Sequence, residues 1–228
     1  MCGIAGIIAL KNADGREAAE SVIQKMNEVQ FHRGPDGEGI YLSQSGSVAF
    51  GHRRLSIIDL SEGGHQPMEN AKGVITFNGE IYNYRELREE LKEKGFVFQS
   101  NSDTEVLLSA LSLWGKDTFS RLNGMWAFAW YNSEEEKVLL CRDRFGIKPL
   151  YYWVNQDKIY FASEIKAFTV IPEWKADLNY QNAMDFLTYG VFDHNEHTLF
   201  KDIRQVRPGS YLEIDLKNQK LHKVYFWN

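Results

Sequence analysis

The chain has 228 residues, of which 43% are hydrophobic and 25% are charged, and its formal net charge is −5. This length suits a domain with a sizeable core, and the acidic balance argues against a nucleic-acid-binding surface. The two cysteines, Cys2 and Cys141, form neither a disulfide framework nor a zinc pattern, which favours a reducing compartment. No apolar run approaches the ~20 residues of a membrane helix, and the first residues lack the features of a signal peptide. We therefore expect one cytoplasmic domain, residues 1–228, with no membrane or nucleic-acid partner.

Hydrophobic spacing predicts the elements of the first half of the chain. Residues 3–10 form a continuous apolar run, typical of a buried strand, and residues 17–30 carry an apolar stripe at helical spacing. Glycines and a proline indicate a loop at 32–39. The segment from Ser102 to Glu105 matches a capping box before an apolar helix. The remaining expected elements are strands 47–53 and 74–77, helix 84–94 and that apolar helix at 106–114.

In the second half, most of the expected short strands follow one another directly, and a few helices come between or after them. Ser163 and Glu164 resemble a second capping signal that opens a short helix to Phe168, and Gly190 ends a helix at 179–189. Strands are expected at 125–131, 137–142, 150–154 and 159–162, with a closing hairpin at 210–215 and 221–227. Nine or ten strands and four or five helices result, without regular βαβ alternation. We therefore expect mostly antiparallel sheets with helices packed outside them.

Cys2 directly follows the initiator methionine, which is normally removed when the second residue is small. Removal leaves a thiol and a free α-amino group on one residue. Such groups titrate near ~8.5 and ~7.7–8.0, so a proton can pass between them at neutral pH. An N-terminal amine acting as base for its own residue's nucleophile is a known means of activation. A cysteine at position 2 also occurs by chance, so this interpretation depends on the rest of the chain.

Three other segments carry residues suited to amide chemistry. Asn78 and Gly79 offer a side-chain amide and an unobstructed backbone N–H to an oxyanion, although Asn-Gly is also a common turn. Arg54 lies at a strand end and suits a substrate carboxylate, with a surface arginine as the alternative. Asp103 suits a substrate ammonium group, but a polar residue here also suits a helix N-terminus.

Other reactive side chains are interpreted as structural. Cys141 lies inside an apolar strand and is expected to be an inert core thiol. His32, His52 and His65 lack metal-ligand spacing, so we expect no metal site.

Seven segments occur in an order that resembles a known family. They are MCGIAG (1–6), HRGPD (32–36), RLSIID (54–59), NGEIYN (78–83), SDTE (102–105), RDRFGIKPLY (142–151) and ASEIK (162–166). Together they resemble the class II glutamine amidotransferase domain of glutamine-hydrolysing asparagine synthetases, over residues 1 to about 226. The related glucosamine-6-phosphate synthase and phosphoribosyl-amidotransferase glutaminases share the Cys-Gly-Ile start but differ in the second and sixth segments.

This resemblance implies a fold and a set of roles. The fold is α+β, a four-layer αββα N-terminal nucleophile hydrolase sandwich with two mainly antiparallel sheets. Cys2 is implied as the nucleophile, and its own amine as general base and then general acid. The resemblance assigns the oxyanion hole to Asn78 and Gly79, the glutamine α-carboxylate to Arg54, its α-ammonium to Glu80 and Asp103, and substrate orientation to the backbone near Ile57 and Ile58.

The resemblance also implies partners outside this chain. Asparagine synthetases carry a second, ATP-using domain with a Ser-Gly-Gly-x-Asp-Ser phosphate loop, and this motif does not occur here. We therefore expect an excised glutaminase domain that acts on L-glutamine and supplies ammonia to a C-terminal synthetase domain. ATP and Mg are expected only in that missing domain, with no cofactor in this one. The ammonia acceptor and a homodimer are left open.

Two other functions are compatible with the sequence. The first is a non-catalytic glutamine-binding or regulatory module, which retention of Met1 would favour because the Cys2 nitrogen would then be an amide. The second is a different N-terminal nucleophile amide hydrolase. The combination of Arg54, Glu80 and Asp103 favours free glutamine over a larger amide.

Overall fold

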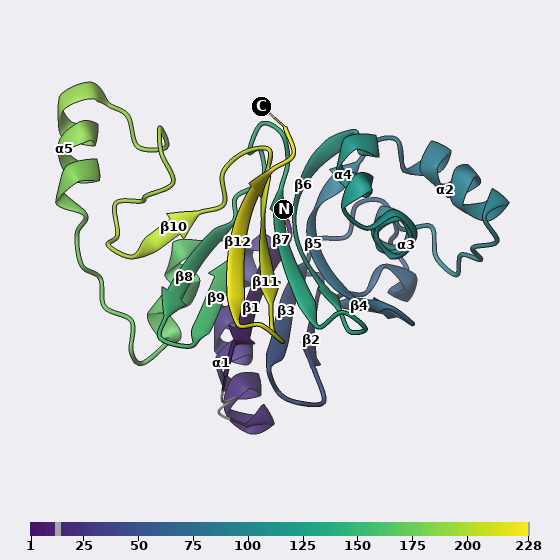
Figure 1. Ribbon diagram of the computed structural model, residues 1–228, viewed down its shortest axis with the longest axis horizontal. Helices are drawn as coiled ribbons and strands as arrows, with labels where there is room; N and C mark the ends of the chain where they lie inside the picture. The colour runs from purple at the N-terminus through teal and green to yellow at the C-terminus, as the bar shows by residue number, and fades with distance from the viewer. Residues whose placement is uncertain (12–14, 228) are drawn as a thin grey trace.

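Two six-stranded antiparallel sheets form the centre of the computed structural model, which describes residues 1–11 and 15–227 (Figure 1). The first sheet has the strand order β10-β8-β9-β1-β3-β2. Its strands are β1 (Gly3–Ala9), β2 (Gly37–Leu42), β3 (Val48–Arg54), β8 (Tyr151–Asn155), β9 (Lys158–Ala162) and β10 (Ile203–Gln205). The second sheet has the order β12-β11-β7-β6-β5-β4. Its strands are β4 (Met68–Asn70), β5 (Gly73–Ile81), β6 (Gly124–Asn132), β7 (Lys137–Arg142), β11 (Ser210–Asp215) and β12 (Lys220–Tyr225).

Helices cover the outer faces of both sheets. The α-helices are α1 (Arg16–Val29), α2 (Tyr84–Glu93), α3 (Asp103–Trp114), α4 (Thr118–Arg121) and α5 (Tyr180–Tyr189). Four 3₁₀ turns accompany them among the described residues: η1 (Phe31–Arg33), η2 (Glu62–Gly64), η3 (Gly115–Asp117) and η4 (Ile165–Val170). Figure 1 shows α1 against the first sheet and α2, α3 and α4 on the far side of the second. No described helix is long and apolar enough to cross a membrane.

The hydrophobic core has three parts, one between each pair of neighbouring layers. Ile4, Ile8 and Phe50 of the first sheet meet Leu140 and Ile214 of the second. A second cluster joins α1 and η4 to the first sheet, and a third joins α2, α3 and α4 to the second sheet. Burying each such aliphatic side chain stabilises the fold by about 1.5–3 kcal/mol. The expected four-layer αββα sandwich is therefore confirmed.

Strand β1 lies inside the first sheet, paired with β3 on one side and β9 on the other. All seven of its residues are buried, which explains the continuous apolar run. Gly6 is required for close packing, since a Cβ there would lie 2.1 Å from a ring carbon of Phe161. Cys2 immediately precedes this strand, so a rigid central element holds its backbone.

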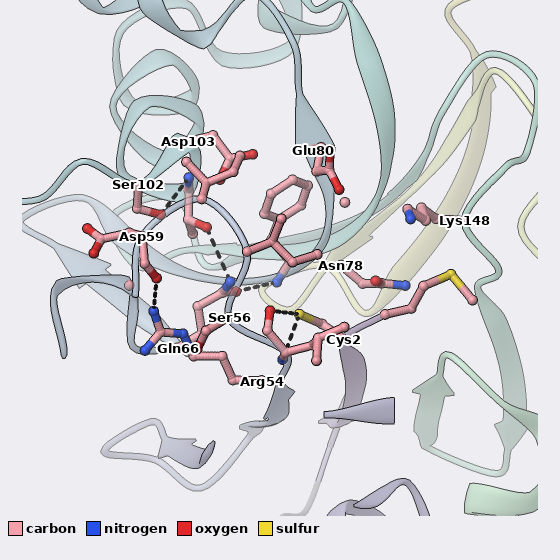
Figure 2. A pocket seen from close by; sticks show the side chains of 18 residues that line it. Cys2, Arg54, Ser56, Asp59, Gln66, Asn78, Glu80, Ser102, Asp103 and Lys148 are labelled. Carbon is pink, nitrogen blue, oxygen red and sulfur yellow. Dashed lines mark hydrogen bonds between the residues drawn. The ribbon is translucent and has the colours of Figure 1, made fainter. Parts of the chain in front are cut away.

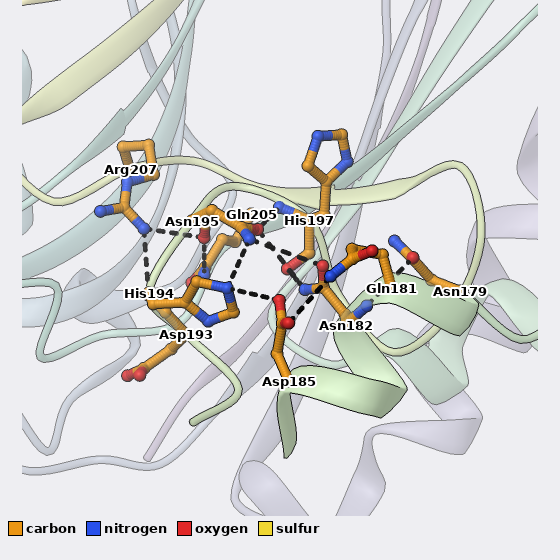
Figure 3. Close-up of polar contacts among 10 residues, drawn as sticks. All are labelled: Asn179, Gln181, Asn182, Asp185, Asp193, His194, Asn195, His197, Gln205 and Arg207. Atoms are coloured by element: carbon orange, nitrogen blue, oxygen red, sulfur yellow. Dashed lines mark hydrogen bonds and ion pairs between the residues drawn. The ribbon is translucent and has the colours of Figure 1, made fainter. Parts of the chain in front are cut away.

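The second half of the molecule includes one helix held mainly by polar contacts. Only Asn182 of α5 is buried, and its Nδ2 donates to the His197 carbonyl at 2.9 Å (Figure 3). Asp185 of the same helix pairs with His194 Nε2 at 3.1 Å. Gln205 of β10 donates to the Asn195 carbonyl at 2.7 Å. This network ties α5 to the edge of the first sheet at β10.

Both expected capping signals need correction. Ser102 caps α3 by accepting from Thr104 N at 3.0 Å, but Glu105 does not return to the Ser102 N–H. Instead its carboxylate accepts from the N–H groups of Gln99 and Ser100, each at 2.8 Å. Ser163 caps no helix.

The Ser163 hydroxyl accepts from Ile4 N at 3.0 Å, and the turn that follows, η4, is a 3₁₀ helix without a side-chain cap. A buried backbone donor on β1 competes for the same hydroxyl, and sequence spacing does not reveal that competition.

The strand prediction was also incomplete. The described residues form twelve strands, because the short strands β4 and β10 and the edge strand β2 were not expected. The prediction of a loop at 32–39 was wrong in part, since this range includes the end of η1 and the start of β2. Strand β5 does not end at Phe77 but continues to Ile81. Asn78 and Gly79 are therefore strand residues, and the interpretation of Asn-Gly as a turn is wrong.

Candidate active site

A cavity of about 100 Å³ opens beside Cys2, where the ends of β1, β3 and β5 meet the N-terminus of α3 (Figure 2). Five segments from distant parts of the sequence supply its walls. The structure brings all eight sequence-predicted residues together here: Cys2, Arg54, Ile57, Ile58, Asn78, Gly79, Glu80 and Asp103.

The Cys2 thiol is fixed by backbone contacts to Leu55, the residue after β3. Its Sγ lies 3.4 Å from Leu55 N, which donates to it, and 3.6 Å from Leu55 O. Arg33 Nε donates to the Cys2 carbonyl at 2.9 Å. Burial raises the pKa of the thiol, while the Leu55 N–H and nearby positive charges lower it. Met1 lines the same cavity, and while it is attached the Cys2 nitrogen is an amide with no basic lone pair.

Beyond its pairing with β4 at residues 73–75, β5 presents a row of backbone donors along an edge that no strand covers. Phe77 N donates to Gln66 Oε1 at 2.7 Å, and Ile81 N donates to Asp103 Oδ2 at 3.0 Å. Because backbone N–H groups alternate along a strand, Gly79 N–H points to the same edge, between these two. A Cβ at Gly79 would lie 2.3 Å from Met125 O. Only glycine fits here, and its N–H faces the cavity.

Asn78 supplies a second donor from the face of β5 that looks toward the first sheet. Its side chain is 1% exposed, and Nδ2 is buried with no hydrogen-bond partner among the described residues. Leaving such a donor unpaired costs about 1–3 kcal/mol. An unsatisfied amide beside a thiol is suited to a negatively charged oxygen that is present only during reaction.

Replacing Asn78 with alanine is expected to lower kcat for amide hydrolysis by roughly 10²–10³-fold with a smaller change in KM. The lost donor acts mainly on the transition state, so ground-state binding is largely retained. Steady-state kinetics on purified variant and parent protein measure both constants. An increase confined to KM would assign Asn78 to substrate binding instead.

Arg54 ends β3 and is anchored to the loop that follows. Its Nη2 donates to the Asp59 carbonyl. The Asp59 carboxylate in turn accepts from Ser61 N and from Asn101 N, both at 2.9 Å. The Ser61 hydrogen bonds lower the pKa of Asp59. This network holds the loop containing Ile57 and Ile58 against the residues that precede α3.

Two carboxylates face Arg54 across the cavity. Burial raises the pKa of Asp103 to about 6, although the Ile81 N–H opposes the shift and Glu80 adds to it. Asp103 is the first residue of α3, and Ser102 performs the capping. The backbone N–H groups of Thr104 and of Asp103 itself, at the helix N-terminus, also lower the pKa of this carboxyl against the larger effect of burial, so the helix-terminal role of Asp103 stands beside a role toward a ligand. Glu80 lines the cavity from β5.

Gln66 and Lys148 are among the polar residues of the cavity that sequence reasoning did not assign to the site. Gln66 holds the edge of β5 and also donates to Thr104 Oγ1 at 3.2 Å. Lys148 enters from the segment between β7 and β8. Lys148 belongs to the RDRFGIKPLY motif, which was recognised as a family feature but not linked to the site. No single motif identifies Gln66, because it acts through tertiary contacts.

The remaining reactive residues lie elsewhere. Cys141 is completely buried in β7, and burial strongly raises the pKa of its thiol. His52 is buried between the sheets, where Nδ1 lies 3.1 Å from Thr76 Oγ1. Burial lowers the pKa of His52 to about 3, so its ring is neutral. Within residues 1–11 and 15–227, no group of three His, Cys, Asp or Glu side chains is arranged to hold a metal ion.

A four-layer sandwich that carries a thiol at the head of an interior strand has the N-terminal nucleophile fold. Comparison with known families identifies the family of this chain within that fold. The chain belongs to the glutamine amidotransferase domain family, whose family model matches residues 1–227.

Curated relatives agree with this family. The chain is 40% identical over 228 residues to asparagine synthetase (glutamine-hydrolyzing) 1 of Bacillus subtilis strain 168. This match covers 99% of this chain and 35% of the relative. It is 34% identical over 247 residues to the putative asparagine synthetase (glutamine-hydrolyzing) 2 of Methanocaldococcus jannaschii. This second match covers 100% of this chain and 46% of that relative. The chain thus spans between a third and a half of these relatives' length.

Solved structures agree on the fold. The glutamine phosphoribosylpyrophosphate amidotransferase from Bacillus subtilis, complexed with ADP and GMP, matches with a TM-score of 0.73. The match covers 99% of this chain and 49% of that chain at 22% sequence identity. It shows that the two chains share the N-terminal nucleophile fold.

Proposed function

We propose that this chain hydrolyses L-glutamine to L-glutamate and ammonia, with Cys2 as the nucleophile. The observation that carries the proposal is the unpaired Asn78 amide in the same small cavity as the Cys2 thiol. A buried donor without a partner is costly, and a tetrahedral intermediate supplies the oxygen it lacks. The family of the chain and its relatives support the same activity.

The reaction proceeds in two halves once Met1 is removed. The Cys2 α-amine accepts the thiol proton, and sulfur attacks the side-chain amide carbon of glutamine. Asn78 Nδ2 and Gly79 N–H stabilise the resulting oxyanion. The ammonium formed on Cys2 gives its proton to the leaving nitrogen, the carbon–nitrogen bond breaks, and ammonia departs from a thioester. Water then attacks the thioester, its proton returns through the amine, and glutamate leaves.

Charge placement accounts for selection of a free amino acid. Arg54 binds the α-carboxylate, while Glu80 and Asp103 accept from the α-ammonium. The backbone near Ile57 and Ile58 orients the substrate. A ligand without these two charges leaves the side chains of the cavity unpaired, which gives strong discrimination. Since protonation of Asp103 removes its negative charge, glutamine binding weakens as the pH falls through about 6.

The ammonia serves a second domain in this proposal. The relatives are named as glutamine-hydrolyzing asparagine synthetases and extend well beyond the matched region. We therefore assign the product to a C-terminal synthetase domain of the parent protein. ATP and Mg belong to that domain, and the residues of the Cys2 cavity perform hydrolysis without a cofactor.

The test is a product assay on protein whose Met1 has been removed, verified by intact mass. Glutamine is expected to give equimolar glutamate and ammonia, measured by coupled enzymes, whereas N-acetylglutamine and glutaramate are poor substrates. Absence of turnover in fully trimmed protein contradicts the proposal.

Arg54→Leu tests recognition of the glutamine α-carboxylate. Its contact to the substrate carboxylate exists in both ground and transition states, so KM for glutamine rises while kcat changes little. An unchanged KM would show that the carboxylate binds elsewhere.

A further inference from the structure

The segment after β7 is built around one lysine. Asp143 Oδ2 accepts from Lys148 N at 3.0 Å, and Arg142 Nε donates to Lys148 O at 2.8 Å. Asp143 is 1% exposed and Arg142 is 8% exposed. Two buried charged side chains therefore hold both backbone groups of Lys148.

The same two side chains make the rest of the segment rigid. Asp143 Oδ1 also accepts from Phe145 N and Ile147 N, each at 3.0 Å. Arg142 donates to Gly146 O at 2.7 Å and to Val206 O at 2.9 Å. These charge-assisted hydrogen bonds hold the backbone of the segment in one conformation. The direction of the Lys148 side chain is therefore fixed as well.

That direction is into the Cys2 cavity. Lys148 is 6% exposed and lines the cavity together with Cys2 and Glu80 (Figure 2). Among the residues that the structure describes, its Nζ has no hydrogen bond and no carboxylate within ion-pair distance. Its Nζ is not among the fully buried polar atoms that lack a partner, so the ammonium group keeps contact with the solvent of the cavity while most of the side chain is buried.

The other charged groups around Cys2 are either paired with another residue or are carboxylates that line the cavity. Arg33, from η1, pairs with Glu164 at 2.9 Å. Although burial opposes the shift, hydrogen bonds from Arg33, His32 and Lys166 lower the pKa of Glu164 to about 2, so it remains a carboxylate.

The charged groups of the cavity lining are also accounted for. Arg54 Nη2 donates a hydrogen bond to the Asp59 carbonyl. The further charged or titratable groups facing the cavity are Asp59, Glu80 and Asp103. His52 of β3 is neutral and lies between the two sheets, outside the cavity lining.

We propose that Lys148 is a positioning residue for the nucleophile, whose ammonium charge favours the Cys2 thiolate and disfavours a protonated Cys2 amine. The proposal deepens the proposed function and rests on it. An opposite charge stabilises a thiolate, and a like charge destabilises an ammonium group, so both effects favour loss of a proton from the Cys2 pair. Lys148 is among the charges that lower the pKa of the Cys2 thiol against the larger effect of burial.

The test measures the reactivity of Cys2 toward iodoacetamide as a function of pH, in trimmed protein. Lys148→Met keeps the length of the side chain and removes its charge, and Lys148→Arg keeps the charge. We expect Lys148→Met to alkylate about tenfold more slowly at pH 7, with a profile moved to higher pH, and Lys148→Arg to resemble the parent. The acid limb of the kcat/KM profile for glutamine should move in the same direction. Lys94→Met, which removes one exposed positive charge beyond α2, controls for net charge.

Two results would overturn the proposal. One is an unmoved alkylation profile in folded Lys148→Met, with Lys148→Gln as a second neutral variant should the first fail to fold. The other is a loss of activity shared by Lys148→Met and Lys148→Arg with no change in pH dependence, which indicates a purely structural lysine. Alkylation requires no glutamine, so its profile is informative even if the protein shows no glutaminase activity.

Discussion

Cys2→Ala is expected to lower glutamine hydrolysis by about 10⁴-fold or more while leaving the fold intact. The thiol supplies the atom that bonds to the substrate, and no other group in the cavity replaces it. Cys2 precedes β1 and is not part of the three core clusters, so its removal leaves the packing unchanged. Glutamate release, together with the thermal unfolding midpoint, measures both expectations.

Cys141→Ala is the matched control. It removes the second thiol of the chain from a fully buried position in β7. We expect a loss of stability and unchanged chemistry, the reverse of the Cys2 variant. Turnover at the parent rate in Cys2→Ala, or inactivation confined to Cys141→Ala, would mean that the wrong thiol was chosen.

The second large effect concerns the amine of Cys2. An uncleavable residue before Cys2 converts that amine to an amide, so the thiol loses its proton acceptor. The expected loss in kcat is about 10²–10⁴-fold, the range for removal of a general base. Glutamine binding should change much less, because Arg54, Glu80 and Asp103 are untouched. Intact mass confirms each N-terminus, and turnover and equilibrium binding are compared in the two preparations.

Equal turnover in trimmed and extended protein would identify another base and remove the N-terminal nucleophile mechanism. The same comparison tests the alternative of a non-catalytic glutamine-binding module. Met1 lines the Cys2 cavity, so a protein that retains it fits the alternative. In that case both preparations bind glutamine and neither hydrolyses it.

Much of the site followed from sequence because short motifs carry it. Cys2, Arg54 and Asp103 each stand in a segment whose residue order is distinctive, and local chemistry suggests a role for each. The central strand was also evident, since a strand buried on both faces is continuously apolar. The family, the fold and the proximity of all eight predicted residues agree with that reasoning.

What sequence could not supply depends on contacts between distant segments. Asn-Gly favours turns locally, yet pairing with β6 keeps Asn78 and Gly79 in an extended strand. Glu105 satisfies the capping pattern, but its carboxylate accepts hydrogen bonds from the backbone N–H groups of Gln99 and Ser100 instead of from Ser102. Lys148 lies far from Cys2 in sequence, and only the fold of its loop directs it to the cavity.

The unpaired edge of β5 has a consequence for the length of the substrate. The N–H groups of Gly79 and Ile81 lie about 6.6–6.8 Å apart, the rise of two strand residues. The Ile81 N–H holds the Asp103 carboxylate. In the reaction proposed above, the Gly79 N–H meets the reacting amide oxygen and the Asp103 carboxylate receives the α-ammonium. Asparagine is one methylene shorter than glutamine and cannot reach both points, a difference worth about 1–3 kcal/mol. The spacing of donors along an extended backbone thus selects the length of the amino acid, and the proposed glutaminase is protected from hydrolysing the shorter amide.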